Sequence, residues 1–588
     1  MALQPLSSSE DILSLVFSHS SKQDLCSLCL VSHSFNTIAT PILYRSINLI
    51  EPDRDRRFIV DHSAEENEAE TKRLRSRRQW LLLSRLEDEE NEKLRNLVQE
   101  VNLSLLNLDG TPDPDFIDHL TKDDRLCNLL NNFSNLRRVH LGTKKLITDE
   151  IIGTISNHAR KPSLSLSLRH IDDVLETISF RKEALGCLID LSATVNPYYD
   201  WTGPNKVMLQ VQDLFFNSPN LRSFSLSLYG NYGGCVSRRP RFENVTSFRL
   251  KGAEKFPPLD ELRLDGYGIN DTEWHYWQQG LDWGRLSSLT VGPQSAFGIL
   301  KRLVGYVVSL KTLRVYRYPD MRWRGEASDP VAMKLEELLN SLDGLEVLEV
   351  KGVPVSVEVV GLHKGLKKLC LHEEETANEG GERKLLTLDE VEYLERCCPE
   401  LRDLKVKIKI GEGEMNEGLF IKLAASFPHL CSLSLHFEIG LANVAIRPRK
   451  SLLPTGDPSD ETSRATLPPL TTTTALSIGK RFFNIRREAG IEITPWFTLT
   501  LWTGNYFRRW PQWEPRYVSV EKSFSATFEV SVPNPQSREV QMRHLEKEEL
   551  DMHTSRKKDS GGSCRFRVHD LARRVRAVSD ENEPIRDL

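Results

Sequence analysis

The residues best suited to chemistry in this 588-residue chain are cysteines and clustered carboxylates, but their spacing does not match that of a metal site or a catalytic site. Cys26 and Cys29 form a lone C-x-x-C pair, and Cys397 and Cys398 are adjacent. Neither pair has the second pair of ligands that a tetrahedral zinc site needs. The acidic run at 373–375 is not accompanied by a basic residue at a spacing typical of a catalytic site. We therefore expect no bound metal and no cofactor.

The usual sequence marks of an enzyme are also missing. The chain has no G-x4-G-K-[ST] loop, no G-x-S-x-G elbow and no H-E-x-x-H pair. Its 78 basic residues are balanced by 83 acidic ones, so no strong field favours a nucleic acid. No apolar run approaches the ~18–20 residues that span a bilayer, and the 10 cysteines are spaced irregularly, as in reducing compartments. These patterns predict a non-enzymatic protein of the cytoplasm and/or nucleus, with no nucleic-acid or membrane partner.

A short apolar pattern repeats along the chain and indicates the elements of the scaffold. It consists of an apolar residue, any two residues, a second apolar residue, any one residue and a third apolar residue. The last two apolar positions alternate with polar ones, which is typical of a short half-buried strand. The copies are Val98/Val101/Leu103, Leu136/Val139/Leu141, Leu221/Phe224/Leu226, Leu259/Leu262/Leu264, Leu286/Leu289/Val291, Leu310/Leu313/Val315, Leu345/Leu348/Val350, Leu366/Leu369/Leu371, Leu401/Leu404/Val406 and Leu430/Leu433/Leu435.

Helical patterns precede several of these strands. Leu335, Leu338, Leu339 and Leu342 share one helix face, and Gly344 favours a helix end just beyond them. A helix and a strand of this size cannot bury their apolar sides alone, whereas stacked copies share a continuous core. The pattern over residues 98–440 resembles the leucine-rich repeat family, although other residues fill the position where that family usually has Asn or Cys. The resemblance implies a solenoid, or horseshoe, with a concave face of strands.

The first fifty residues do not follow the repeat. Residues 3–49 predict three short helices, the first with Ile12, Leu13, Val16 and Phe17 on its apolar face. The string E-D-I-L…V-F…D-L…L-x-L-V-S-x-x-F…I-A…P-x-L-Y resembles the F-box, a small three-helix motif, although two serines stand where that family usually has Leu-Pro. The alternative is that these helices only cap the solenoid.

The F-box resemblance implies docking to the S-phase kinase-associated adaptor of an SCF-type cullin-RING E3 ubiquitin ligase, with a later domain that recruits the substrate. Carried over to this sequence, it implies a mixture of docking and core positions at Ile12, Leu13, Val16, Phe17, Leu25, Leu28, Val31 and Tyr44. In the solenoid, the polar residues beside the buried strand positions are candidates for contact with a protein substrate. They are Arg138, His140, Glu261, Arg263, Arg314, Tyr316, Glu349, Lys351, Lys368, His372, Asp403, Lys405 and His436.

The remaining segments predict connecting and terminal regions. Residues 50–97 form a charged helical connector, in which the basic run at 72–78 is either an import or nucleic-acid patch or, as its acidic flanks favour, a solvated helix face. Residues 441–475 are rich in Pro and Thr and indicate a loop or linker. Residues 476–532 predict a tryptophan-rich β cap, which either seals the array or presents a ligand platform, and residues 533–588 a polar, disordered tail.

These expectations combine into an α/β fold, in which a three-helix F-box motif is followed by an irregular leucine-rich-repeat solenoid with a β-rich C-terminal cap. The expected function is that of a substrate-receptor subunit in an SCF complex, which binds the adaptor, and through it the cullin, and recruits an unidentified protein substrate. One alternative is a leucine-rich-repeat interaction scaffold that is not linked to ubiquitination. The other is an enzyme whose site lies in the C-terminal region.

Overall fold

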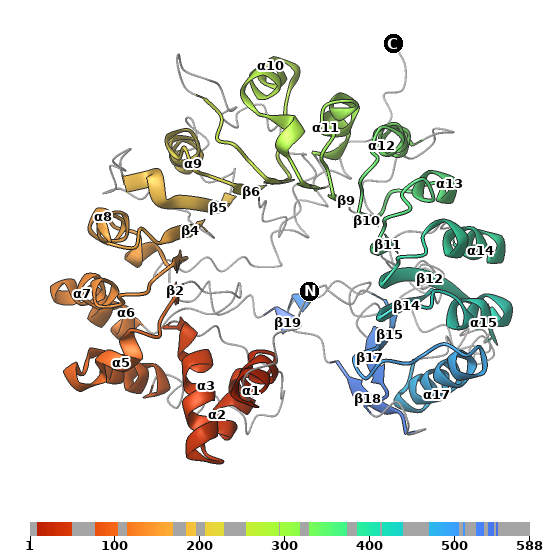
Figure 1. Cartoon of the computed structure of the whole chain (residues 1–588). Coiled ribbons are helices and arrows are strands. Elements are labelled where there is room, and N and C mark those ends of the chain that lie inside the picture. Colours follow the sequence, from red (N-terminus) through yellow and green to blue (C-terminus); the bar gives the residue numbers. More distant parts are fainter. Residues whose placement is uncertain are drawn as a thin grey trace, which may run out of the picture.

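The computed structural model describes residues 9–49, 77–103, 114–168, 184–195, 206–228, 255–292, 295–317, 329–372, 385–411, 414–438, 470–504, 510–511, 525–533, 539–545 and 549–550. These residues form a mixed α/β fold, in which three N-terminal helices lead into one long sheet. The strands follow one another around an arc and the helices lie on its outer side (Figure 1). None of the described helices is long and apolar enough to cross a bilayer.

The long sheet has 17 strands, and a separate pair, β16 and β19, forms a two-stranded sheet. The strands are β1 (Ser46–Asn48), β2 (Glu100–Leu103), β3 (Arg138–Leu141), β4 (Ser163–Leu168), β5 (Leu188–Val195), β6 (Ser223–Leu228), β7 (Glu261–Asp265), β8 (Ser288–Val291), β9 (Thr312–Tyr316), β10 (Val347–Lys351), β11 (Lys368–His372), β12 (Asp403–Gly411), β13 (Glu414–Met415), β14 (Ser432–Glu438), β15 (Thr498–Thr503), β16 (Trp510–Pro511), β17 (Ala526–Ser531), β18 (Gln541–His544) and β19 (Glu549–Leu550).

Helices alternate with these strands through most of the chain. The α-helices are α1 (Ser9–Ser18), α2 (Lys22–Cys29), α3 (His33–Arg45), α5 (Glu92–Arg95), α6 (Pro114–Thr121), α7 (Arg125–Asn131), α8 (Asp149–Asn157), α9 (Lys206–Asn217), α10 (Asp271–Gly280), α11 (Ala296–Leu303), α12 (Pro330–Asn340), α13 (Val357–Val360), α14 (Leu388–Cys397), α15 (Glu417–Ala425) and α17 (Thr472–Glu488). Residues 77–87 are also helical.

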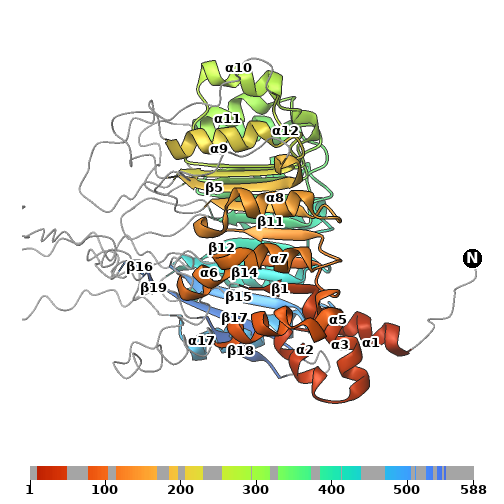
Figure 2. The ribbon, with the colours of Figure 1, turned by 90° about the vertical axis from the view of Figure 1, so that its left-hand side faces the viewer.

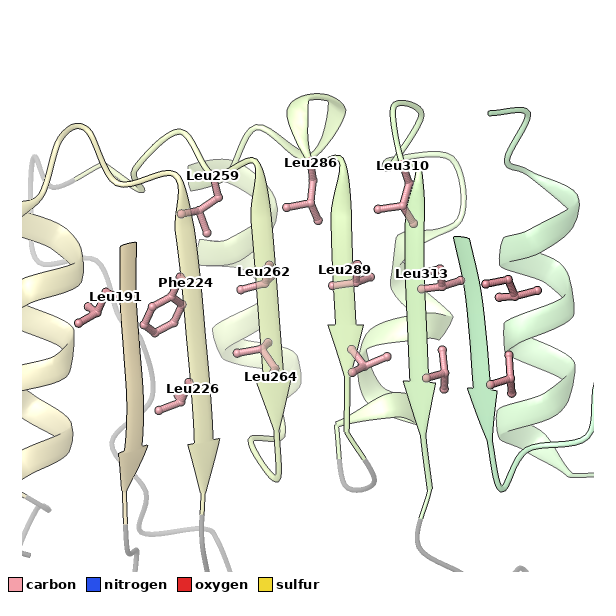
Figure 3. Packing of buried hydrophobic residues seen from close by; sticks show 14 of the residues in the cluster. Leu191, Phe224, Leu226, Leu259, Leu262, Leu264, Leu286, Leu289, Leu310 and Leu313 are labelled. Atoms are coloured by element: carbon pink, nitrogen blue, oxygen red, sulfur yellow. The ribbon is translucent and has the colours of Figure 1, made fainter. Parts of the chain in front are cut away.

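From β1 to β12, and on through β14 to β15, neighbouring strands of the arc pair in parallel, in a register that stacks the leucines of the repeated pattern. Leu262 lies opposite Leu289, which lies opposite Leu313, and the row continues in the same way into the later strands. Figure 3 shows these side chains at one level in neighbouring strands, on the side that faces the helices. All of them are buried in a single core. Each buried leucine stabilises the fold by about 1.5–3 kcal/mol, so the row holds neighbouring repeats together.

Several helices start at side chains that cap their free N–H groups. In α14, Thr387 accepts a hydrogen bond from the Glu390 amide while the Glu390 side chain accepts one from the Thr387 amide. In α12, the carboxylate of Asp329 caps the helix and Pro330 fills its first position. Both arrangements satisfy backbone donors that have no partner inside the helix. The local sequence therefore sets where the outer helices begin.

Two further strands, β4 and β5, lie between the second and third repeat patterns. In β4, the triplet would be Lys161/Leu164/Leu166, so its first position is a lysine. In β5, the spacing Leu188/Leu191/Ala193 follows the pattern with a small third residue. The register also shifts between Leu164 and Ser165. The sequence suggests that Leu164/Leu166/Leu168 and Leu185/Leu188 are remnants of at least one repeat in this region, and the structure places two strands there.

The C-terminal end of the sheet differs from the predicted linker, β cap and tail. Residues 472–488, which straddle the predicted border between linker and cap at 475, form the long helix α17. β15 then pairs with β14 in parallel and extends the sheet, whereas β17 and β18 pair in antiparallel fashion at its end. β18 and β19 lie in the predicted tail. The threonine run suggested a loop, but Thr471 caps α17 by accepting from the Thr474 amide.

The three N-terminal helices join the sheet without a linker. α3 ends at Arg45, and β1 begins at Ser46 and pairs with β2. Tyr44 lies in the main core, and the Arg85 guanidinium lies 5.7 Å from the centre of its ring. Figure 2 shows α1–α3 at one edge of the arc. The direction of these helices relative to the sheet is therefore fixed by buried contacts.

Candidate partner-binding surfaces

The N-terminal three-helix module (residues 9–49) has its own small core. Phe17, Leu25 and Ala39, one from each helix, are buried together. The ring of Phe35 packs edge-on against Phe17, with the ring centres 5.2 Å apart. Ser21 and Asp24 form a reciprocal cap at the start of α2. These contacts fix the angles between three short helices, none of which is long enough to be stable alone.

A second apolar stripe on α1 faces solvent. Ile12, Leu15 and Val16 are 49%, 64% and 55% exposed. Positions i, i+3 and i+4 lie on one helix face, so these three side chains form a patch beside the core stripe of Leu13 and Phe17. The module thus buries one apolar stripe and leaves a second one accessible.

The turn between α2 and α3 adds two more exposed apolar residues. Leu30 is 89% and Val31 is 65% exposed. Together with Ile12, Leu15 and Val16 they form what we call the exposed apolar set. Exposed apolar side chains that lie together, as Ile12, Leu15 and Val16 do on α1, are typical of protein-binding surfaces.

The structure separates the eight residues implied by the F-box resemblance. Ile12, Val16 and Val31 are exposed, whereas Leu13, Phe17, Leu25, Leu28 and Tyr44 pack into the small core or, for Tyr44, the main core. Leu15 and Leu30 were not among the predicted residues, although their helical or turn positions beside Val16 and Val31 are visible in the sequence. Ile12, Val16 and Val31 are therefore the most accessible of the eight, whereas Leu13 and Leu28 are half-buried.

The inner face of the sheet carries the predicted substrate-binding residues. Successive strands place Arg263, Thr290, Arg314, Glu349 and, beyond them, Cys370 and Lys405 in one row, because each lies opposite the next in register. Arg138 and His140 lie apart from them on β3, where the His140 Nε2 is 3.0 Å from a carboxylate oxygen of Glu100. The predicted residues therefore form two groups along the arc.

A connected ion-pair network joins β9 to β12. Glu349 lies at its centre: its Oε1 is 3.0 Å from Lys368 Nζ and 3.5 Å from Arg314 Nε. The hydroxyl of Tyr316 donates to Glu349 Oε2 at 3.0 Å. Lys368 Nζ is also 3.5 Å from Asp403 Oδ2. Together with Lys351 and Lys405 these residues make up what we call the β9–β12 sector.

The network shifts the proton affinities of its members. Burial raises the pKa of Glu349, but the hydrogen bonds from Lys368 and Tyr316 outweigh it and the pKa lies below its ordinary value. Burial lowers the pKa of Lys368, and its pairing with Glu349 more than offsets this, so the pKa lies above its ordinary value. Both groups therefore stay charged at neutral pH.

The inner face of β4–β6 is rich in hydroxyl groups instead. Ser165, Ser192, Ser225 and Thr194 lie there with one carboxylate, Asp190. Burial raises the pKa of Asp190, although hydrogen bonds with serines on both neighbouring strands oppose the shift. The inner face thus changes from neutral and polar to charged along the arc.

Two predicted substrate-binding residues, His372 and His436, are removed from the accessible surface. They are 5% and 0% exposed, and the ring of Trp502 lies 4.5 and 4.3 Å from theirs. The Trp502 indole donates to the Ser434 hydroxyl at 3.0 Å. Trp502 occupies the same inner-face position on β15 as His436 on β14. These histidines therefore contribute to packing rather than to a contact surface.

Buried histidines predict loss of stability in acid. Burial lowers the pKa of His363, which is 1% exposed, and lowers that of His372 well below its ordinary value. A histidine in the unfolded chain takes up a proton near pH 6.5, whereas the lowered pKa of these two delays their protonation to lower pH in the folded protein. Their contribution is therefore fully present above about pH 6.5 and is lost as pH falls below it, by up to about 1.4 kcal/mol per pH unit per group.

We expect His363→Leu to make the pH dependence of stability shallower between about pH 6.5 and pH 5, because it removes one of these groups. Urea denaturation at several pH values measures the change. His275→Leu, which replaces an exposed histidine on α10, controls for the substitution itself. Equal slopes for His363→Leu and the unmodified protein would contradict the assignment.

The described residues hold no cluster of ligands suited to a metal ion, and the eight cysteines among them, Cys26, Cys29, Cys397 and Cys398 included, form no disulfide with one another. The acidic run at 373–375 lies outside the described residues.

Comparison with known families identifies the N-terminal segment. Residues 10–50 match a family model described as F-box-like. The match covers the three-helix module and its join to β1, and thus the whole exposed apolar set. No curated protein matches the chain.

Proposed function

We propose that this chain is a substrate-receptor subunit of an SCF-type cullin-RING E3 ubiquitin ligase. In this proposal the F-box-like module binds the S-phase kinase-associated adaptor, which connects it to the cullin. The observation that carries the proposal is the exposed apolar set, which lies on the one segment that matches the F-box-like family. A partner that covers these side chains would remove their apolar surface from water.

The curved sheet is proposed as a leucine-rich-repeat solenoid whose inner face binds a protein substrate. Its support is the parallel register of the leucine row and the accessible charged network of the β9–β12 sector. The proposed domain limits are 3–49 for the F-box-like module and 98–440 for most of the solenoid, with β1 and β15 extending its sheet at either end. The chain itself would transfer no group, and we place it in the cytoplasm and/or nucleus.

The fixed join between α3 and β1 supports this division of labour. Tyr44, Ile47 and Leu49 anchor the end of the module in the main core. A substrate held on the sheet would therefore have a defined direction relative to the adaptor. Without such a join, the module could turn freely and the substrate would sample many positions.

Capture of purified adaptor by the full chain tests the proposal. We expect a stable complex in size-exclusion chromatography, and ubiquitin transfer to a bound substrate when cullin and RING subunits are added. Point variants are better controls than deletion of residues 1–50. That deletion removes β1 and three buried residues of the main core, Tyr44, Ile47 and Leu49. A folded chain that does not capture the adaptor would favour a scaffold that is not linked to ubiquitination.

A further inference from the structure

We propose that the β9–β12 sector binds an acidic segment of the substrate protein. This inference rests on the proposed function, since it specifies the chemistry that the inner face would recognise. The sector carries four cationic side chains, Arg314, Lys351, Lys368 and Lys405, and two carboxylates, Glu349 and Asp403. The whole chain has a net charge of −5, so this local excess of cations does not follow from the overall composition.

The two carboxylates are already neutralised from within the protein. Glu349 accepts from Tyr316 and contacts Arg314 and Lys368, and its side chain is only 13% exposed. Asp403 shares Lys368 with it. Glu349 is therefore little accessible to a partner, whereas Asp403, which is 34% exposed, is paired with Lys368.

Arg314 and Lys368 keep hydrogen-bonding capacity and access to solvent while they pair with Glu349. A guanidinium has five N–H donors and an ammonium has three. The side chains of Arg314 and Lys368 are 31% and 40% exposed while they contact Glu349. Lys351 lies over the ring of Tyr316, 5.1 Å from its centre, which holds its charge at the surface of the sheet. Donors held in this way suit carboxylates, because charge-assisted hydrogen bonds are the strong ones.

The turns leading into the same strands extend the positive region. Lys311 and Lys367 flank one carboxylate, Glu346, at 3.5 and 2.6 Å. Neighbouring strands lie about 4.8 Å apart, so β9 to β12 span about 15 Å, the length of four or five extended residues. The surface therefore fits a short acidic stretch laid across the strands.

Binding of a fluorescein-labelled oligoglutamate peptide to the full chain tests this inference by fluorescence anisotropy. We expect saturable binding that weakens as salt is raised, because the contacts are ionic. Lys368→Gln combined with Lys405→Gln should weaken binding about tenfold. Lys364→Gln combined with Lys480→Gln changes the net charge equally at exposed lysines outside the inner face and should leave binding within about twofold.

A variant with the opposite sign separates recognition from damage to the fold. Glu349→Gln removes a negative charge from the sector and keeps the size of the side chain, so it should tighten oligoglutamate binding about threefold. If the substitutions acted only by damaging the fold, peptide binding would weaken both in the Lys368→Gln/Lys405→Gln variant and in Glu349→Gln. Circular dichroism confirms that each variant is folded.

The inference would be overturned by the absence of saturable oligoglutamate binding, by equal loss of binding in the inner-face and outer lysine pairs, or by weaker binding to Glu349→Gln. Displacement of the peptide by a single-stranded oligonucleotide at lower concentration than by free oligoglutamate would also overturn it, since the surface would then favour phosphodiesters. Adaptor capture is measured separately in the same preparation. A chain that captures the adaptor but not the peptide refutes only this inference, whereas the reverse result refutes the ligase role.

Discussion

Replacing Ile12 and Val16 together by aspartate should weaken adaptor binding about a hundredfold or more. Both side chains are about half exposed on the free protein, so the change costs the fold little. In a complex they would be covered, and each substitution would remove apolar contact and bury a carboxylate. Apolar contacts at the centre of an interface contribute about 2 kcal/mol each, and two such losses exceed a hundredfold change in affinity. Isothermal titration calorimetry with purified adaptor measures the effect.

The matched control uses exposed apolar residues elsewhere on the arc. Val308→Asp combined with Leu362→Asp makes the same chemical change at side chains that are 65% and 58% exposed. These positions belong to the segments before β9 and β11, away from α1–α3 (Figure 1). The control should bind the adaptor as the unmodified chain does. Undiminished binding by the Ile12/Val16 variant would show that α1 does not face the adaptor.

The spacing of apolar residues in α1 predicts two neighbouring apolar faces, which the mean apolarity of the helix does not reveal. Leu13 and Phe17 are four residues apart and pack inward, whereas Ile12, Leu15 and Val16 lie on the neighbouring face and stay exposed. A sequence shows that both stripes exist, because helical spacing is read directly from residue numbers. It does not show which stripe the other two helices cover. That choice depends on Leu25 and Ala39, which only tertiary packing brings to Phe17.

The strand positions are predictable because the two-residue period of a strand is read directly from residue numbers. The contacts on the inner face of the sheet are not predictable in this way. Alternation places Arg314, Glu349 and Lys368 on one face of the sheet, and parallel register brings them together. The burial of His372 depends on Trp502, which lies far along the chain and reaches the same face only because β15 continues the sheet. A buried histidine and an accessible histidine occupy the same kind of position in the alternation of apolar and polar residues along a strand. Sequence periodicity therefore predicts a face but not what covers it.

The last helix of the array depends on one buried charge, and Arg486→Ala should lower the free energy of unfolding of the C-terminal end by about 3–5 kcal/mol. Arg486 on α17 is fully buried. Its guanidinium donates to the carbonyls of Ala424, Ser426 and Phe427 at 3.2–3.4 Å, where α15 ends. The negative end of the α15 dipole favours this cation. Burial lowers its pKa to about 10, so it stays protonated at neutral pH.

The arginine also fills space between aromatic rings, which is why the loss should be large. Its guanidinium carbon lies 4.9 Å from the ring centre of Phe497. Alanine would leave a cavity there and three carbonyls without their donor. Since β15 and β17 lie at the C-terminal end of the sheet and pair only with their neighbours in it, the damage should remain at this end. Hydrogen exchange should therefore speed up in β15 and β17 and stay unchanged in β2 and β3.

Lys480→Ala on the same helix provides the control, because Lys480 is exposed. Its effect on unfolding and exchange should be within about 0.5 kcal/mol of zero. Arg486→Lys keeps the charge but not the fork of donors, so an intermediate loss would assign part of the stabilisation to hydrogen-bond geometry. If Arg486→Ala changed stability no more than Lys480→Ala, the aromatic packing of Phe482 and Phe497 alone would hold α17 on the sheet. The two outcomes differ by several kcal/mol, so thermal unfolding and hydrogen exchange together decide between them.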